Sequence, residues 1–489
     1  MSGQRDHLLA LLLCAVFVVA GCISISKPGL QADESLFAMG VYYPQGVGWS
    51  VNALGRQIPL MQMSYLGSLK AWIYGPLFQL WPPSAASVRI PMVIAGAATL
   101  WLVWLLLRDV ASPRAGLIAL AVLALDPSLV WTTRCDWGPT ALQHLLAVAG
   151  VYAVARRRFE IGALLFGLAL WDKAAFAWNL AGLGVAAAVV LRGEIRRFMT
   201  LRRAALCGLA FCLGGLPLLA FNWRSGGETA RQTALFEPSR VITTTAPLIY
   251  ALDGRALYGY LVRDDFQGVR KTVTPWLLLA AVLALPWLLR TPARRPALFF
   301  LIAAVTAWLA MVTTVGGGES VHHLVLLWPW PHLFLAVALA QLPRGVGTVL
   351  AAGALLSCGL VTANYHRMLR SHGADPPWSN AIYGLAEFVP TVPSSRIYVT
   401  DWGILDQLRL LSRGKAPLHP DPGMPERLDD PEALYIGHTD RYQAFEAINA
   451  KVEQAAEALG FEKRVVAVFR DGQGNEVFQV FRMVPRSRR

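Results

Sequence analysis

The chain has 489 residues, of which 55% are apolar and only 15% are charged, and its net charge is +13. Soluble domains have about 25% charged residues, so this composition argues against a water-soluble protein. The arginines cluster between apolar runs without interleaved aromatic residues, and the six cysteines contain no CxxC pair, which argues against a nucleic-acid partner, a disulfide framework and a zinc site.

Apolar runs of about twenty residues, long enough to cross the hydrocarbon core of a bilayer, recur along most of the chain. The first run, Leu8 to Ile25, contains Val19-Ala20-Gly21-Cys22, which also looks like a lipoprotein cleavage box, but the span count favours a retained segment. The further predicted spans are Val88–Leu107, Ala115–Trp131, Pro139–Ala155, Ile161–Leu170, Ala174–Leu191, Ala204–Phe221, Val273–Leu289, Ala297–Val315, Leu324–Leu342 and Val346–Ala363. We therefore predict an all-α polytopic membrane protein with about eleven transmembrane helices.

The basic clusters predict the orientation of these spans. With the N-terminus in the cytoplasm, every compact cluster lies in a cytoplasmic loop, as the positive-inside rule requires. The clusters are Arg108 to Arg114, Arg156 to Arg158, Arg192 to Arg203, Arg290 to Arg295, and the turn at Arg344. This orientation needs a hairpin at Trp171-Asp172-Lys173, because charges at that depth of a single span are costly in lipid.

The odd number of spans places four loops, the turn at Trp171-Asp172-Lys173 and the tail outside, on the periplasmic face of a bacterial inner membrane. The first loop, residues 26–87, contains the amphipathic stretch Met63 to Leu80, which is typical of a helix at the membrane interface. Residues 1–364 are predicted to form the membrane domain and residues 365–489 a small periplasmic α/β domain.

The tail has the pattern of a βαβαββ unit. Its predicted helices are Trp402–Leu411, capped by Asp401, and Arg441–Leu459, with apolar residues at Phe445, Ile448, Val452 and Ala455. The predicted strands are Arg396–Thr400, Ala433–Ile436, Val465–Phe469 and Val477–Phe481.

Three acidic residues near the outer face are candidate catalytic groups. Asp33 and Glu34 follow the first span, and Asp136 lies in a very short outer loop. A buried carboxylate suits a general base that deprotonates a hydroxyl, and two carboxylates together suit a divalent cation. The alternatives are structural: an acidic pair favours the start of a helix, and Asp before Trp-Gly-Pro is typical of a turn.

Cationic groups on the same face are candidate ligands for a lipid phosphate. They are Lys70, Arg89, Lys173, His322 and His323, with Arg224, Arg231, Arg240 and Arg263 in the third outer loop as further candidates. Lys173 also has a structural reading, because its neighbour Asp172 can neutralise it, and most loop arginines are simply solvated. Two adjacent histidines do not have the spacing of a metal site, so no metal ligand is assigned.

The order of these motifs resembles the GT-C membrane glycosyltransferases, which include the protein O-mannosyltransferases and the lipid A aminoarabinose transferases. The resemblance covers roughly residues 8 to 345. It rests on Asp33-Glu34, Arg89-Ile90-Pro91, Asp136, the Gly167-to-Lys173 hairpin, and His323 to Pro329 before a late span. The chain departs from the family at Ile58-Pro59-Leu60, where the family often has Pro-Pro-Leu, and at His322-His323.

The resemblance implies an inverting transfer of a hexosyl or pentosyl group from a polyprenyl-phosphate donor to a hydroxyl of a protein, lipid or glycan. Asp33 would be the base, and Asp136, with Glu34, would hold the acceptor or a divalent cation such as Mg²⁺ or Mn²⁺. Lys173, His323 and loop arginines would stabilise the leaving phosphate. The alternative is a lipid or sugar transporter or flippase, although transporters usually carry polar residues at the midplane of the bilayer.

Overall fold

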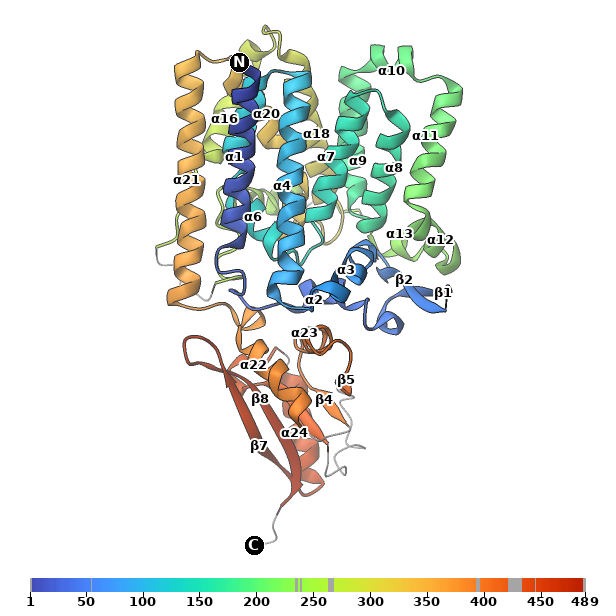
Figure 1. Cartoon of the computed structure of the whole chain (residues 1–489), viewed down its shortest axis with the longest axis vertical. Helices are drawn as coiled ribbons and strands as arrows, with labels where there is room; N and C mark the ends of the chain where they lie inside the picture. Colours follow the sequence, from blue (N-terminus) through green and yellow to red (C-terminus); the bar gives the residue numbers. More distant parts are fainter. Residues whose placement is uncertain are drawn as a thin grey trace.

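The computed structural model describes residues 2–53, 55–233, 236–237, 240–262, 268–392, 396–420, 433–444 and 446–486. A helical bundle forms the larger part, and a small α/β domain lies beyond one end of it (Figure 1). The principal helices of the bundle are α1 (Ser2–Cys22), α4 (Ala85–Val110), α5 (Pro113–Leu123), α6 (Pro127–Arg134), α7 (Ala141–Ala155), α8 (Phe159–Asp172), α9 (Phe176–Val190), α11 (Leu201–Gly214), α16 (Thr274–Leu283), α18 (Arg294–Val312), α20 (Trp330–Gln341) and α21 (Arg344–Ser371).

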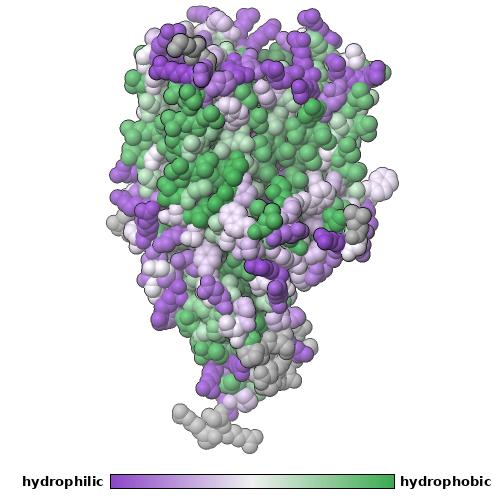
Figure 2. All heavy atoms as spheres, viewed as in Figure 1, coloured by the Kyte–Doolittle hydropathy of each residue, from purple (hydrophilic) through white to green (hydrophobic). Residues whose placement is uncertain are grey.

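Short helices connect these elements, and a wide apolar surface covers the side of the bundle that is visible in Figure 2. The short helices are α10 (Arg192–Phe198), α12 (Leu216–Ser225), α13 (Glu228–Thr233), α14 (Arg240–Thr243), α15 (Thr245–Leu252), α17 (Leu285–Leu288) and α19 (Val321–Leu324). Four fully buried tryptophans, Trp104, Trp131, Trp328 and Trp330, fill the interior. Because apolar side chains lie both inside and on the outer surface, the bundle suits a lipid environment.

The chain is a multi-pass membrane protein. Among the described residues, four helices are long and apolar enough to cross a membrane, or up to eight if each of four bent helix pairs forms one span. The predicted count of about eleven spans is therefore not confirmed. Hydropathy measures composition along the chain, whereas the bends depend on local caps and prolines.

Three predicted spans are bent instead of straight, the tenth by 44° between Val321–Leu327 and Trp330–Gln341. The third consists of α5 and α6, which meet at 68° because Asp126 caps α6 and Pro127 begins it. The seventh consists of α11 and α12, which meet at 73° where Pro217 starts the second helix. The predicted hairpin near Lys173 is confirmed, because α8 and α9 are separate helices.

The basic loops were predicted to lie on one side of the membrane. Contacts of their arginine side chains at one end of the bundle agree with this prediction. Ion pairs join Arg156 to Asp109 at 3.1 Å and Arg295 to Glu194 at 2.9 Å. The Arg114 guanidinium also donates to the carbonyl of Leu342 at 2.8 Å. The α/β domain lies at the opposite end (Figure 1). The side of the membrane that each end faces remains a prediction from charge.

The first loop contains more regular structure than its sequence predicted. Its elements are α2 (Ala32–Met39), η1 (Pro44–Gly46), β1 (Trp49–Ala53), β2 (Arg56–Met63), β3 (Leu66–Gly67) and α3 (Leu69–Leu80). The three strands form an antiparallel sheet in the order β1-β2-β3. The predicted interface helix is α3, and it begins at Leu69 because Met63 still pairs with Leu66 in the sheet.

The tail forms a five-stranded sheet in the order β5-β4-β6-β8-β7. Its elements are α22 (Ala381–Phe388), β4 (Ile397–Val399), α23 (Leu405–Leu411), β5 (Leu418–Pro420), β6 (Leu434–His438), α24 (Glu446–Ala458), β7 (Phe461–Arg470) and β8 (Glu476–Pro485), with the 3-10 turns η3 (Pro376–Trp378), η4 (Val389–Thr391) and η6 (Asp440–Tyr442). The four predicted strands correspond to β4, β6, β7 and β8, whereas the short edge strand β5 was not predicted.

The prediction for Asp401 was wrong in detail. The helix after it begins at Leu405, and the Asp401 carboxylate instead accepts hydrogen bonds from His438 at 2.8 Å and from the Ala444 amide at 3.0 Å. Phe445, predicted as an apolar residue of the second tail helix, is outside the described residues. The side chains of Ile448 and Val452 are also outside them. The predicted domain boundary at residue 364 falls inside α21, which continues to Ser371.

Candidate active site

Asp33 and Glu34 lie in the first turn of α2, and Gln31 determines their geometry. The Gln31 side chain accepts hydrogen bonds from the amides of Asp33 at 2.7 Å and Glu34 at 3.3 Å. The Glu34 carboxylate reaches back to the Gln31 amide at 3.3 Å, which completes a capping box. The cap directs the Glu34 carboxylate into the protein interior and the Asp33 carboxylate toward the surface.

Glu34 is directed into the interior, where it pairs with Arg89 from α4. The two side chains are almost fully buried and form two parallel contacts of 2.6 and 2.8 Å. The remaining Arg89 donors bind the carbonyls of Ile25, Pro28 and Gly29 at 2.7 to 2.8 Å. The pair therefore ties the segment after α1 to α4 and holds α2 in place.

Asp33 is only partly buried, and its carboxylate forms no ion pair with any described residue. Burial raises the pKa of this carboxyl above its usual value, and a hydrogen bond with the Gln31 side chain opposes part of that effect. A carboxylate with a raised pKa and no cationic partner has the properties of a general base.

The loop between α6 and α7 carries Asp136, which is 2% exposed. One carboxylate oxygen accepts hydrogen bonds from the amides of Thr140 at 2.6 Å and Ala141 at 3.1 Å, at the start of α7. The other oxygen lies 3.0 Å from the ammonium of Lys70, which comes from α3. The turn-and-cap alternative for Asp136 thus agrees with its contacts, and the same residue also orients Lys70.

Lys173 and His322 lie against the same short loop, and His323 packs on His322. The Lys173 ammonium donates to the Gly138 carbonyl at 2.6 Å. His322 packs so closely on Gly138 that an added Cβ would lie 2.5 Å from the His322 Cβ. The His322 and His323 rings are 4.3 Å apart, and His322 also forms a 2.7 Å hydrogen bond with Ser320. Two predicted phosphate ligands therefore meet at one loop, and the third, His323, lies beside them.

Aromatic side chains connect Asp33 to this cluster. Phe37 lies one helical turn after Asp33 on the same face of α2, and the Lys70 ammonium is 5.3 Å from the Phe37 ring. Burial and the negative charge of Asp33 raise the pKa values of Tyr65 and Tyr260. Tyr260 also stacks on Trp137, at 5.4 Å between ring centroids. Asp33, Asp136, Lys70, Lys173 and His322 therefore share one region at the end of the bundle that faces the C-terminal domain (Figure 1).

The sequence analysis did not select Tyr65 or Tyr260, and the chain offers little signal for them. Of the four loop arginines, Arg224 lies 5.4 Å from the Trp49 ring, and Arg231 donates to the carbonyl of Ser225 at 2.8 Å. Arg240 lies in α14, and Arg263 is outside the described residues.

The C-terminal domain also contributes to the surroundings of Asp33. Its helix α23 packs on α2, and the Gln407 side chain donates to the carbonyl of Leu30 at 2.6 Å. Burial raises the pKa of Asp406 in the same helix to about 6; Arg409 opposes this shift and the negative charge of Asp33 adds to it. A second carboxyl group with a raised pKa thus lies near Asp33, at the interface between the domains.

Asp406→Asn is expected to stabilise the fold at pH 7 by about 1 to 3 kcal/mol. An unfolded aspartate has a pKa of about 3.9, so the unfolded state loses its proton first as the pH rises, and Asp406 destabilises the fold progressively between about pH 4 and pH 6. Thermal unfolding of both proteins from pH 4 to 8 measures this effect. Equal pH dependence in the variant and the wild type would contradict the assignment.

The described side chains do not build a cation site. Among them, no three His, Cys, Asp or Glu residues are arranged to hold a metal ion. Asp136 already contacts Lys70 and the start of α7, and Glu34 contacts Arg89. No step proposed below depends on a bound cation.

Comparisons with known proteins identify the fold. No protein-family model and no curated protein matches the sequence. ArnT from Cupriavidus metallidurans, solved bound to undecaprenyl phosphate, matches with a TM-score of 0.63 and 14% identity over 96% of this chain and 97% of that chain. The chain has the GT-C fold. The fold expected from the sequence resemblance is thus confirmed.

The Archaeoglobus fulgidus oligosaccharyltransferase is a second structural relative. Its apo form matches with a TM-score of 0.54 and 12% identity, over 98% of this chain and 74% of that chain. Its complex with Zn and sulfate matches with a TM-score of 0.56 and 12% identity, over 97% and 72%. At these identities the likeness establishes the GT-C fold, while the chemistry has to be argued from the site.

Proposed function

We propose that this protein is an inverting glycosyltransferase that moves a sugar from a polyprenyl-phosphate donor to an acceptor hydroxyl at the outer face of the inner membrane. The observation that carries this proposal is Asp33, a partly buried carboxylate without an ion-pair partner among the described residues. It lies in the same region as the cluster of Lys70, Lys173 and His322. A base beside a cationic cluster suits displacement of a phosphate leaving group.

Asp33 accepts the proton of the acceptor hydroxyl as its oxygen attacks the anomeric carbon of the sugar. The new carbon–oxygen bond forms on the face opposite the leaving group, so the configuration inverts. The bond from the anomeric carbon to the phosphate oxygen breaks, and its electron pair remains on the polyprenyl phosphate. Asp33 then returns the proton to solvent.

Lys173, with His322 and His323 as hydrogen-bond donors, stabilises the negative charge that grows on the departing phosphate. Lys173 and His322 are fixed against the backbone of one loop, and this arrangement costs little reorganisation during the reaction. In the proposal, Asp136 positions Lys70 and the start of α7, and the Glu34–Arg89 pair positions α2. These two acidic residues thus support the reaction without taking the proton.

The shared fold supports the choice of donor. ArnT, which has the same fold, was solved with undecaprenyl phosphate bound. A lipid-linked donor also explains why the candidate site lies at the end of a membrane bundle, beside the interface helix α3. The acceptor in the proposal is a hydroxyl of a protein, lipid or glycan of the cell envelope.

Envelope mass spectrometry tests this function. Proteins, lipids and glycans are compared from cells that express the wild type, no protein, or the Asp33→Asn variant. The proposal expects a product heavier by one sugar residue that requires the wild-type chain. Purified wild-type protein should also release polyprenyl phosphate from the donor. Identical envelopes together with an unconsumed donor would reject glycosyl transfer.

Lys173→Met is expected to weaken donor binding about tenfold to a hundredfold, because a hydrogen bond to a charged group contributes about 1.5 to 3 kcal/mol. Binding of a polyprenyl-phosphate sugar to protein in nanodiscs measures the effect. Lys463→Met is the matched control, because Lys463 pairs with Glu453 on the surface of the C-terminal domain. Unchanged donor affinity in Lys173→Met would remove Lys173 from the phosphate site.

A further inference from the structure

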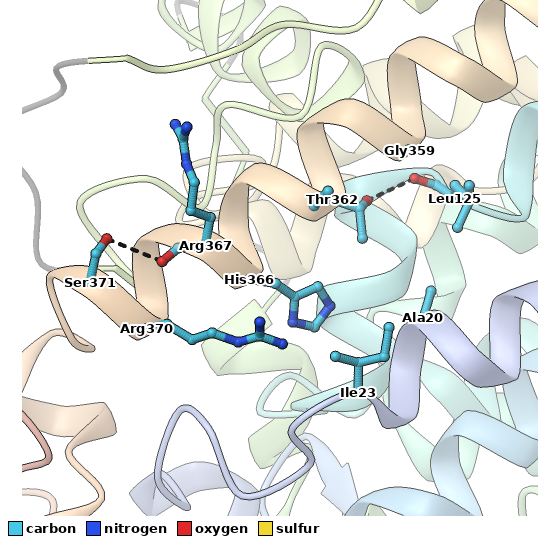
Figure 3. Close-up of a pocket in the computed structure, with 10 residues that line it drawn as sticks. Ala20, Ile23, Leu125, Gly359, Thr362, His366, Arg367, Arg370 and Ser371 are labelled. Carbon is cyan, nitrogen blue, oxygen red and sulfur yellow. Dashed lines mark hydrogen bonds between the residues drawn. The ribbon is translucent and has the colours of Figure 1, made fainter.

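A groove on the side of the bundle lies apart from the candidate active site. It has a volume of about 580 Å³ and lies between the end of α1 and the last third of α21 (Figure 3). The bend between α5 and α6 forms its third wall through Leu125. At this wall, the Thr362 hydroxyl donates to the carbonyl of Leu125 at 2.9 Å.

The two ends of the groove differ in chemistry. The end within the bundle is lined by Ala20, Leu125, Gly359 and Ala363, which are small or apolar. The other end carries His366 and Arg370, whose side chains point toward α1 in Figure 3, while the Arg367 side chain points to the opposite side of α21. α1 and α21 are both candidate membrane spans. The groove thus combines an apolar slot at bilayer depth with cations where the chain leaves the membrane.

The guanidinium groups at this end are not neutralised by the described part of the chain. Arg370 is exposed, and its one described side-chain contact is a long hydrogen bond of 3.4 Å to the Ser24 hydroxyl. Arg367 is also exposed and donates to the neutral Asn364 side chain at 2.7 Å. Since neither forms an ion pair among the described residues, the groove has the charge that an anionic ligand requires.

Helix α6 separates this groove from Asp136. The His366 ring packs on Trp131 at 4.7 Å, and the Arg134 guanidinium covers the other part of Trp131 at 4.8 Å. Arg134 in turn donates to the carbonyl of Ile23 at 2.6 Å, on the α1 side of the groove. The groove is therefore a separate site, and its residue His366 contacts the helix that leads into the Asp136 loop.

We propose that this groove binds an anionic glycerophospholipid of the surrounding membrane. The headgroup phosphate lies between Arg370 and His366, with Arg367 as a second nearby cation on the other side of α21, and one acyl chain follows the slot beside Ala363. Charge complementarity and the position of the cations at the end of two membrane spans favour a bilayer lipid over a soluble anion. The bound lipid packs against α6 and supports the wall that carries Trp131.

Native mass spectrometry of the delipidated full-length protein, titrated with phosphatidylglycerol or phosphatidylcholine, tests this site. Wild type is expected to prefer phosphatidylglycerol. The Arg367→Gln/Arg370→Gln variant should lose about thirtyfold in affinity for phosphatidylglycerol, since each basic residue near an anionic lipid contributes about a five- to sixfold gain in affinity and the two factors multiply. Arg344→Gln, at the far end of α21, is the matched control and should bind normally.

A second variant separates the slot from the charges. Ala363→Trp fills the apolar part of the groove and should lower binding of phosphatidylglycerol while both arginines remain. Equal affinity for the two phospholipids, or unchanged affinity in the double arginine variant, would overturn the proposal. Displacement of phosphatidylglycerol by a much lower concentration of undecaprenyl phosphate would also overturn it, because the groove would then belong to the carrier lipid.

Discussion

Asp33→Asn is expected to lower the rate of sugar transfer about 10²- to 10⁴-fold, the range that a general base contributes. Asparagine keeps the size of the side chain and the amide contact with Gln31, so the capping box of α2 remains. Single-turnover transfer with a saturating polyprenyl-phosphate donor measures the chemical step. Near-normal turnover would remove Asp33 as the base.

The pH profile provides an independent test of the same role. A base acts in its deprotonated form, and burial raises the pKa of Asp33, so the wild-type rate should fall as the pH falls through that raised pKa. The residual rate of Asp33→Asn should lack this step. Asp440→Asn is the matched control, because Asp440 is 83% exposed in the C-terminal domain and should leave both rate and profile unchanged.

Arg89→Met is expected to destabilise the protein by about 3 to 5 kcal/mol, because it leaves the Glu34 carboxylate buried without its partner. The substitution also removes the donors to the carbonyls that follow α1. Unfolding of the purified protein in detergent measures the loss. The double variant Arg89→Met/Glu34→Gln should recover part of it, since the buried charge is then absent.

An exposed ion pair provides the control for this experiment. Arg203 and Glu160 lie 3.6 Å apart with about 40% of each side chain exposed, so Arg203→Met should change stability by less than about 1 kcal/mol. A small effect of Arg89→Met, similar to that of Arg203→Met, would contradict the structural role of the Glu34–Arg89 pair. It would also leave Arg89 available as a phosphate ligand.

The local pattern of the sequence was sufficient for the main features of the fold. Apolar runs predicted helices at bilayer length, the basic loops predicted contacts at one end, and Lys173 marked the break between α8 and α9. Strand and turn patterns located four strands of the C-terminal sheet. These features depend on neighbouring residues and on transfer from water to lipid, so composition and order reveal them.

Other features depend on partners that are distant in the chain. Glu34 and Arg89 are 55 positions apart, and Lys70 and Asp136 are 66 apart. Their residue types alone are compatible with catalysis, with phosphate binding and with a structural ion pair. Only the contacts in the folded protein distinguish these three roles. The bend at Asp126 was also missed, because mean hydropathy over a window does not register a cap and a proline inside an apolar run.

Sequence alone therefore established a polytopic membrane protein with acidic and basic residues gathered toward one face. The tertiary structure decided which of the acidic residues are neutralised: Glu34 by Arg89, and Asp136 by Lys70, with Asp33 left without an ion pair among the described residues. The physical reason is that hydropathy and charge are properties of a segment. The environment of a carboxylate is instead a property of the side chains that folding brings beside it.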